Sequence, residues 1–122
     1  MVLEIDDNNY SEFIEKIDKV VFIDFYSPSC GPCQELLPLL DRLDKYYEDS
    51  AVIAKVNVAQ NPKLAQKYKI SGVPFCIVVG KDKMIKEVEM GMASQDKYFT
   101  MIDKALGTHK SFFQKISDKF KS

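Results

Sequence analysis

The sequence predicts an α/β fold, in which helices flank a central β-sheet. Short segments rich in β-branched and aromatic residues alternate along the chain with segments of helical periodicity. One β segment, 20–26, is almost continuously apolar, as expected for a strand covered on both faces. With 122 residues, of which 46% are hydrophobic, the chain is long enough for one domain with its own core.

The first half of the chain contains three expected strands and two expected helices. Residues 2–5 predict a short opening strand, and residues 8–17 predict a helix with an Asn cap and one apolar face. After the strand at 20–26, a leucine stripe predicts a helix over 32–47, in which Pro38 introduces a kink. Residues 51–58 have the composition of a second central strand.

The second half predicts a helix, a hairpin and a last helix. Asn61 followed by Pro62 is typical of a helix start, and this helix extends to residue 68. Strands at 75–79 and 84–89 flank a turn at 80–83 and should form a hairpin. Ser94 is an expected cap for a helix that ends near residue 106, where Gly107 follows.

Charge and composition restrict the function. Seventeen basic and 18 acidic residues give a net charge of -1, which provides no field to attract nucleic acid, so we expect no nucleic-acid partner. The first twenty residues contain six acidic side chains, unlike a secretory signal, and no apolar run is long enough to cross a bilayer. We therefore expect a cytoplasmic location, where a C-x-x-C pair is more often catalytic than structural.

The motif Cys30-Gly31-Pro32-Cys33 lies between the strand at 20–26 and the leucine-rich helix. Two thiols with this spacing can close a small disulfide ring. The first thiol lies at a helix N-terminus, where unpaired N–H groups and the helix dipole favour a thiolate. This arrangement predicts reversible thiol–disulfide exchange, a reaction for which we expect no cofactor.

The motif and the order of the elements resemble the thioredoxin family over residues 2–107. Besides the C-G-P-C sequence, the positions that carry the resemblance are Asp24, Pro38, Lys55, Asn57, the segment 70–74 that leads into a cis-proline, and Gly91. The resemblance implies a thioredoxin fold, with a mixed sheet flanked by helices, as a domain at 1–107. It also implies a protein-disulfide reductase.

By this resemblance, Cys30 is the nucleophile that attacks a substrate disulfide, and Cys33 is the resolving cysteine. Asp24 lies inside an apolar strand, where burial should raise its pKa and allow it to accept a proton near neutral pH. Lys55, on the next strand, could pair with Asp24 and limit that rise. The alternative is that Asp24 and Lys55 form a structural ion pair.

The resemblance also implies a substrate groove beside the cysteines. Its expected lining is Gly31, Pro32, Val73, Pro74, Gly91 and Met92. The backbone of Val73 would pair with an extended substrate segment. The implied partners are disulfide-containing client proteins and an electron donor of the thioredoxin-reductase type. The alternative is that these residues only form turns.

Four positions differ from the family pattern. Ser29 and Tyr26 stand where the family has Trp, and Gln34 replaces a common Lys and so removes a positive charge that favours a thiolate. Phe75 stands where Thr is frequent. Because Ser29 and Gln34 could raise the reduction potential, a disulfide oxidase or isomerase is the nearest alternative to a reductase.

Cys76 is the third cysteine, and its place in an apolar strand predicts a small buried side chain. A third redox role is the alternative. Cys30, Cys33, Cys76 and His109 would match the ligand count of a zinc site, but a strand cysteine and a histidine near the C-terminus need not converge. We therefore expect no metal.

Residues 108–122 predict an additional amphipathic helix. Its apolar face would contain Phe112, Phe113, Ile116 and Phe120, opposite a row of lysines. Such a helix could pack on the domain or on a second copy, or it could dock to a protein groove or an anionic membrane surface. In the docking case, the whole chain could be an interaction module in which the dithiol is incidental.

Overall fold

The structure, a computed structural model, describes residues 1–108, so the helix expected at 108–122 lies outside the described residues apart from Thr108. Five strands form one mixed sheet in the order β1-β3-β2-β4-β5. Their bounds are β1 Leu3–Glu4, β2 Val20–Tyr26, β3 Ala51–Asn57, β4 Phe75–Val79 and β5 Ile85–Met90. β1 and β2 run parallel to β3, whereas β4 is antiparallel to both β2 and β5.

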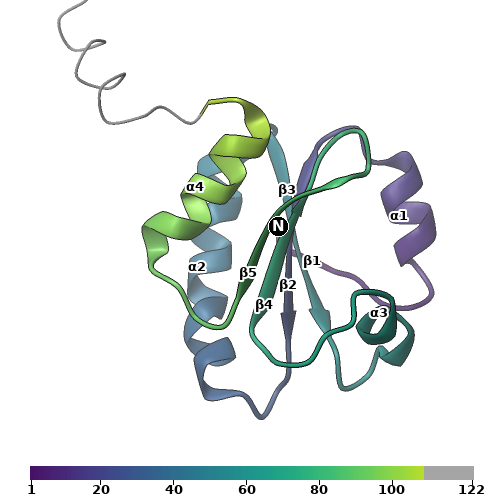
Figure 1. The fold of residues 1–122 in the computed structure, drawn as a ribbon. Coiled ribbons are helices and arrows are strands. Elements are labelled where there is room, and N and C mark those ends of the chain that lie inside the picture. The colour runs from purple at the N-terminus through teal and green to yellow at the C-terminus, as the bar shows by residue number, and fades with distance from the viewer. Residues whose placement is uncertain (109–122) are drawn as a thin grey trace, which may run out of the picture.

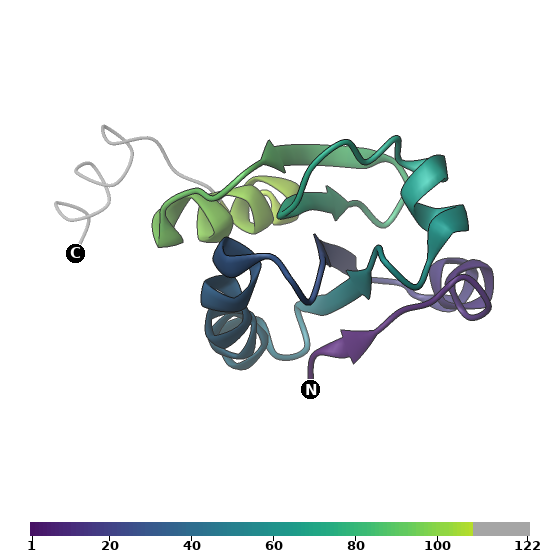
Figure 2. The same ribbon diagram turned by 90° about the horizontal axis from the view of Figure 1, so that it is seen from below.

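Within residues 1–108, four helices cover the two faces of this sheet. They are α1 Tyr10–Lys16, α2 Gly31–Tyr47, α3 Pro62–Lys67 and α4 Gln95–Leu106. α2 and α4 lie on one face, and α1 and α3 lie on the other (Figures 1 and 2). Each face has its own apolar cluster against the sheet. The expected architecture of a mixed sheet flanked by helices is therefore confirmed.

β2 is the central strand, and all seven of its residues are buried. It pairs with β3 on one side and with β4 on the other, so that Asp24 lies between Lys55 and Cys76. The continuous apolar run is explained by the helices on both faces of the strand. Asp24 is the one charged residue in the run.

The ends of α4 lie where the local sequence predicts them. In α4, the Ser94 hydroxyl accepts a hydrogen bond from Lys97 N at 3.3 Å, and Gly107 ends the helix with a left-handed φ of 78°. Both features agree with the sequence prediction. Pro38 lies inside α2, as expected.

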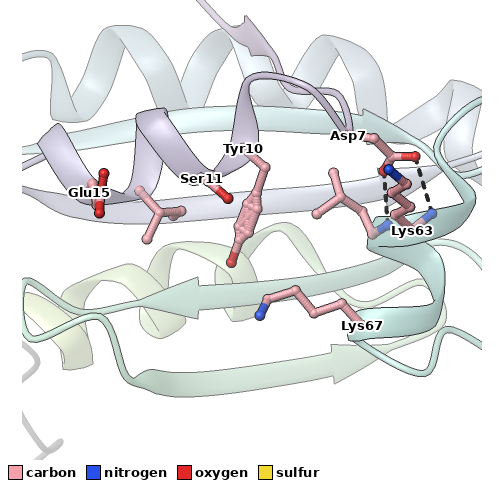
Figure 3. A pocket seen from close by; sticks show the side chains of 8 residues that line it. Asp7, Tyr10, Ser11, Glu15, Lys63 and Lys67 are labelled. Carbon is pink, nitrogen blue, oxygen red and sulfur yellow. Dashed lines mark hydrogen bonds between the residues drawn. The ribbon is translucent and has the colours of Figure 1, made fainter.

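At α1 and α3 an Asn occupies the N-cap position, as expected, but neither side chain forms a capping hydrogen bond. α1 begins at Tyr10, and the side chain of Asn9 accepts from Asp6 N rather than from its own helix. At α3, the side chain of Asn61 makes no capping bond. The Asp7 carboxylate does so instead, by accepting from Lys63 N at 3.1 Å and from Leu64 N at 2.9 Å (Figure 3).

Candidate active site

The cysteine pair lies where β2 ends and α2 begins. Cys30 is the N-cap of α2, and Cys33 lies in the first turn of the helix. The two form a disulfide with their Cα atoms 5.2 Å apart, and Cys33 N donates to Cys30 Sγ at 3.2 Å. Cys30 is partly exposed, whereas Cys33 is fully buried. Only the first sulfur is therefore open to a substrate.

A second loop, which leads into β4, lies against this pair. The Val73–Pro74 peptide bond is cis, and the carbonyl oxygen of Val73 lies 3.7 Å from Cys30 Sγ. Within residues 1–108, neither the N–H nor the carbonyl of Val73 forms a backbone hydrogen bond. Both groups therefore lack a backbone partner that an extended peptide beside Cys30 could supply.

The end of β5 completes this edge of the sheet. Gly91 N donates to the carbonyl of Pro74 at 2.9 Å, and Gly91 has a left-handed φ of 78° that favours glycine. The next residue, Met92, has 47% of its surface exposed. Gly31 and Pro32 are exposed at the start of α2. The expected groove residues therefore come from the start of α2 and from two loops, and the Gly91–Pro74 hydrogen bond joins these two loops.

Asp24 is fully buried behind the pair, on the face of β2 that also bears Val20 and Phe22 and packs against α2. Its Oδ1 accepts from Cys76 Sγ at 3.5 Å, and its Oδ2 has no hydrogen-bond partner within the described residues. Burial raises the pKa of Asp24 from 3.8 to about 7, while the Cys76 hydrogen bond and the positive charge of Lys55 act against the rise. The expected raised pKa is thus found.

Lys55 is the β3 neighbour of Asp24, but it forms no ion pair in the described part of the chain. Its Nζ lies 5.9 Å from the ring centroid of Tyr26 instead. The attraction between Lys55 and Asp24 therefore acts across a longer distance. The alternative of a direct structural ion pair is not found.

Cys76 has a contact that sequence reasoning missed. It is buried, as expected, but its thiol also donates to Asp24. The pairing of β2 with β4 places the two residues directly opposite each other. No local pattern reveals such a register, although a polar residue in each of two central strands was a signal that they could meet.

Two of the four positions that depart from the family pattern, Ser29 and Gln34, make polar contacts beside Cys30. The hydroxyls of Ser27 and Ser29 lie 3.1 Å apart, and Gln34 Nε2 donates to the carbonyl of Pro28 at 3.4 Å. Ser29 and Gln34 are both exposed. The surface beside Cys30 is therefore polar.

A separate hollow lies between α1 and α3, on the opposite face of the sheet from α2 (Figure 3). Asp7, Tyr10, Lys63 and Lys67 contribute to its lining, which includes neither cysteine of the pair. Among residues 1–108, no cluster of three or more potential metal ligands occurs. His109 lies outside the described residues.

A redox-active disulfide at the start of a helix, held against a cis-proline loop on a mixed sheet, defines a thiol–disulfide oxidoreductase. Comparison with known proteins agrees, because the family model "Thioredoxin" matches residues 1–104. The chain belongs to the thioredoxin family. The family implies protein disulfides as substrates and a reductase as a partner.

Curated relatives support this assignment. A thioredoxin of Chlorobaculum thiosulfatiphilum is 34% identical over 104 residues, which cover 85% of this chain and 95% of the relative. Thioredoxin 2 of Chlorobaculum tepidum is 33% identical over 104 residues, covering 85% and 94%. A thioredoxin of Rickettsia prowazekii is 28% identical over 106 residues, covering 87% of this chain and all of the relative. The similarity thus extends over the whole fold.

None of the helices within residues 1–108 has the length and apolar composition needed to cross a membrane.

Proposed function

We propose that this protein reduces disulfides of client proteins, with Cys30 as the nucleophile and Cys33 as the resolving cysteine. The observation that carries the proposal is the unequal exposure of the two sulfurs, since Cys30 is partly exposed and Cys33 is fully buried. A substrate disulfide can reach only Cys30. The helix N-terminus favours the thiolate at this position.

The reaction has two exchange steps. The Cys30 thiolate attacks one substrate sulfur, so that a mixed disulfide forms and the other substrate sulfur leaves with the electron pair. The Cys33 thiol then loses its proton and attacks Cys30, which closes the Cys30–Cys33 disulfide and releases the second substrate sulfur as a thiolate. The substrate gains two electrons, and the cysteine pair is oxidised.

Asp24 is the proposed proton acceptor for Cys33. It lies on the side of β2 that packs against α2, which is the helix that bears Cys33. With a pKa of about 7, its carboxyl is partly ionised near neutral pH and can accept a proton there. Lys55 is proposed to favour the ionised form from the neighbouring strand, since its charge lowers the pKa of Asp24.

The proposed substrate groove contains Gly31, Pro32, Val73, Pro74, Gly91 and Met92. The backbone of Val73 supports pairing with an extended client segment beside Cys30, because its N–H and carbonyl form no backbone hydrogen bond within residues 1–108 and its carbonyl lies beside Cys30 Sγ. The small polar turn at Ser29 would leave this pairing to dominate over side-chain contacts. The disulfide must then be reduced again, for which we propose an electron donor of the thioredoxin-reductase type.

We infer a cytoplasmic location, because a reducing compartment would keep the pair available as a dithiol. We also propose that the exchange domain ends at Gly107 and that residues 108–122 form a separate extension. Docking of this extension to a protein or to an anionic membrane is an expectation from its sequence alone.

The test uses the substitutions Cys30→Ser and Cys33→Ser with a protein disulfide as substrate. We expect both variants to lose turnover. Only Cys33→Ser should accumulate a mixed disulfide with the client, which mass spectrometry after acid quenching would detect. Cys33→Ser/Cys76→Ser is the matched control and should accumulate the same adduct, because the adduct forms through Cys30. Accumulation by Cys30→Ser instead would reverse the assigned roles.

The double substitution Cys30→Ser/Cys33→Ser separates the reductase from an interaction module. An enzyme loses its cellular function with this change, whereas an adaptor retains it. Retention of function would therefore overturn the proposal.

A further inference from the structure

A hydrogen bond from Cys76 to Asp24 connects the third cysteine to the proposed proton acceptor. Cys76 Sγ lies 3.5 Å from Asp24 Oδ1, and both residues are fully buried. The two face each other across the β2–β4 pairing, which fixes their positions in the centre of the sheet. This bond is the only one that the Asp24 side chain makes within the described residues.

The two oxygens of Asp24 are therefore not equivalent. Oδ1 is held by the thiol, while Oδ2 is buried and has no partner among residues 1–108. A buried carboxyl oxygen that accepts no hydrogen bond lowers the free energy of unfolding, so folded proteins contain few such atoms. A role in proton transfer to and from this oxygen explains why it is left free.

We propose that Cys76 is a positioning residue for the resolving step: its thiol holds Oδ1 of Asp24 and leaves Oδ2 as the oxygen that takes the proton from Cys33. This inference rests on the proposed function. In the step, Oδ2 accepts the Cys33 proton, the new thiolate closes the Cys30–Cys33 bond, and the substrate sulfur leaves with its electron pair. Cys76 remains a thiol and is neither oxidised nor consumed.

Burial supports the assignment of Cys76 as a donor rather than a redox group. Burial and the nearby Asp24 charge both raise the pKa of Cys76 well above its usual value, so the thiol keeps its proton. A protonated thiol can donate to a carboxylate but cannot act as a nucleophile. The third redox role considered from sequence is thus not needed.

Other charged and titratable groups also act on this pair. Burial is the largest cause of the raised pKa values of Asp24, Tyr26 and Tyr98. The charge of Lys55 on β3 opposes the rise at Asp24, and the charge of Asp24 adds to the rise at Tyr26 and Tyr98. Glu89 on β5 raises the pKa of Cys76. On α2, the group involved in the proposed proton transfer is Cys33, which forms the disulfide with Cys30 in this structure. Among these groups, Lys55 carries the positive charge that favours ionised Asp24, and Cys76 donates the hydrogen bond to Asp24 Oδ1.

The test compares Cys76→Ala with Cys76→Ser, two variants of similar size of which only the second retains a donor. The first measurement is an NMR titration of the Asp24 carboxyl carbon in the oxidised protein. We expect the alanine variant to raise the Asp24 midpoint by about 0.5 pH unit or more, because a hydrogen bond to the charged form is lost. The serine variant should match the wild type or titrate lower.

The second measurement is the rate of resolution against pH. Reduced protein is mixed rapidly with a symmetrical nitrobenzoate disulfide, whose two coloured thiolate products report attack and resolution in turn. We expect the alanine variant to resolve about twofold more slowly at pH 7, because a midpoint shift of half a pH unit from about 7 lowers the ionised fraction of Asp24 from about one half to about one quarter. The first release, which depends on Cys30, should not change.

Asp24→Asn provides the control background. In this background, replacing Cys76 by Ala should have no further effect on the pH dependence of resolution. If alanine lowers stability too far by leaving a cavity, Cys76→Val fills the space without supplying a donor and should give the same raised midpoint.

Two outcomes would overturn the role of Cys76 while leaving the function intact: equal Asp24 midpoints in the alanine, serine and wild-type proteins, or an alanine effect that persists in the Asp24→Asn background. Failure of the wild type to release either product would instead overturn the proposed function itself.

Discussion

Asp24 lies at the centre of the most buried strand, where one weak thiol donor and a distant lysine replace the water that a carboxylate normally has. The resulting rise of its pKa to about 7 makes the residue useful as a proton acceptor near neutral pH. The same rise has a cost for stability, because the folded protein must carry a buried charge at high pH.

The pH dependence of this cost can be predicted. Below about pH 3.8 the carboxyl is protonated in both states, and between 3.8 and about 7 folding takes up a proton. The free energy of unfolding should therefore fall as the pH rises through this window, and the full penalty is present above it. A pKa rise of this size corresponds to roughly 4 kcal/mol as an upper limit.

We accordingly expect Asp24→Asn to stabilise the oxidised protein above pH 7, by about 2 kcal/mol or more, and to have little effect near pH 4. Chemical denaturation followed by circular dichroism at both pH values would measure this difference. Asp41→Asn, at an exposed position on α2, is the control for loss of a negative charge. A stabilisation of the same size at pH 4 and pH 8.5 would contradict the raised pKa.

At the scale of the elements, local patterns were sufficient where the determinant is a neighbour in sequence. Strand β2 has the predicted bounds because its apolar run is uninterrupted, and α4 begins and ends at the predicted Ser94 and Gly107. The cap of α3 could not be predicted in this way. Its acceptor, Asp7, comes from a loop far away in sequence, so only the packing of α1 beside α3 brings it there.

We expect Asp7→Ala to lower the free energy of unfolding by about 1 kcal/mol, because two N–H groups at the start of α3 lose their acceptor. Asp7→Asn retains an acceptor oxygen and should lose less than the alanine variant. Urea denaturation of both variants measures the two effects. If Asn61→Ala lowered the free energy of unfolding while Asp7→Ala left it unchanged, the assignment of Asp7 as the cap of α3 would be wrong.

In the active site, too, some features could be predicted from the sequence and others could not. The cysteine pair, the cis-proline loop and the buried carboxyl could be anticipated, because each has a recognisable residue type at a recognisable spacing. The hydrogen bond from Cys76 and the absence of a direct Lys55–Asp24 ion pair could not be. Both depend on strand register and on side-chain conformations that sequence spacing does not specify.

At the scale of the whole molecule, two apolar clusters on opposite faces of the sheet form the core of the part of the chain that the structure describes, residues 1–108. Thr108 completes the end of α4, since its N–H and its hydroxyl both donate to the carbonyl of Asp103. These contacts close the last helix of the described residues, where we propose that the exchange domain ends.

We therefore predict that a chain ending after Thr108 unfolds with a free energy within about 0.5 kcal/mol of that of the full chain. It should also reduce a protein disulfide at the same rate. Equilibrium denaturation and a turnover assay measure the two quantities. Loss of stability on truncation would instead indicate that residues 109–122 pack on the domain, and weaker binding to anionic vesicles would assign them a docking role.

The most direct test of the proposed reductase is the reduction potential of the Cys30–Cys33 pair. The protein is equilibrated in graded dithiol buffers and then alkylated after denaturation. Mass spectrometry detects the labels, because the chain has no Trp to report the change by fluorescence. Cys76 is labelled in every state, so oxidised and reduced protein differ by two labels. We expect a value near the −270 mV or so that is typical of thioredoxins, whereas a value of about −120 to −180 mV would contradict a reductase and indicate an oxidase or isomerase.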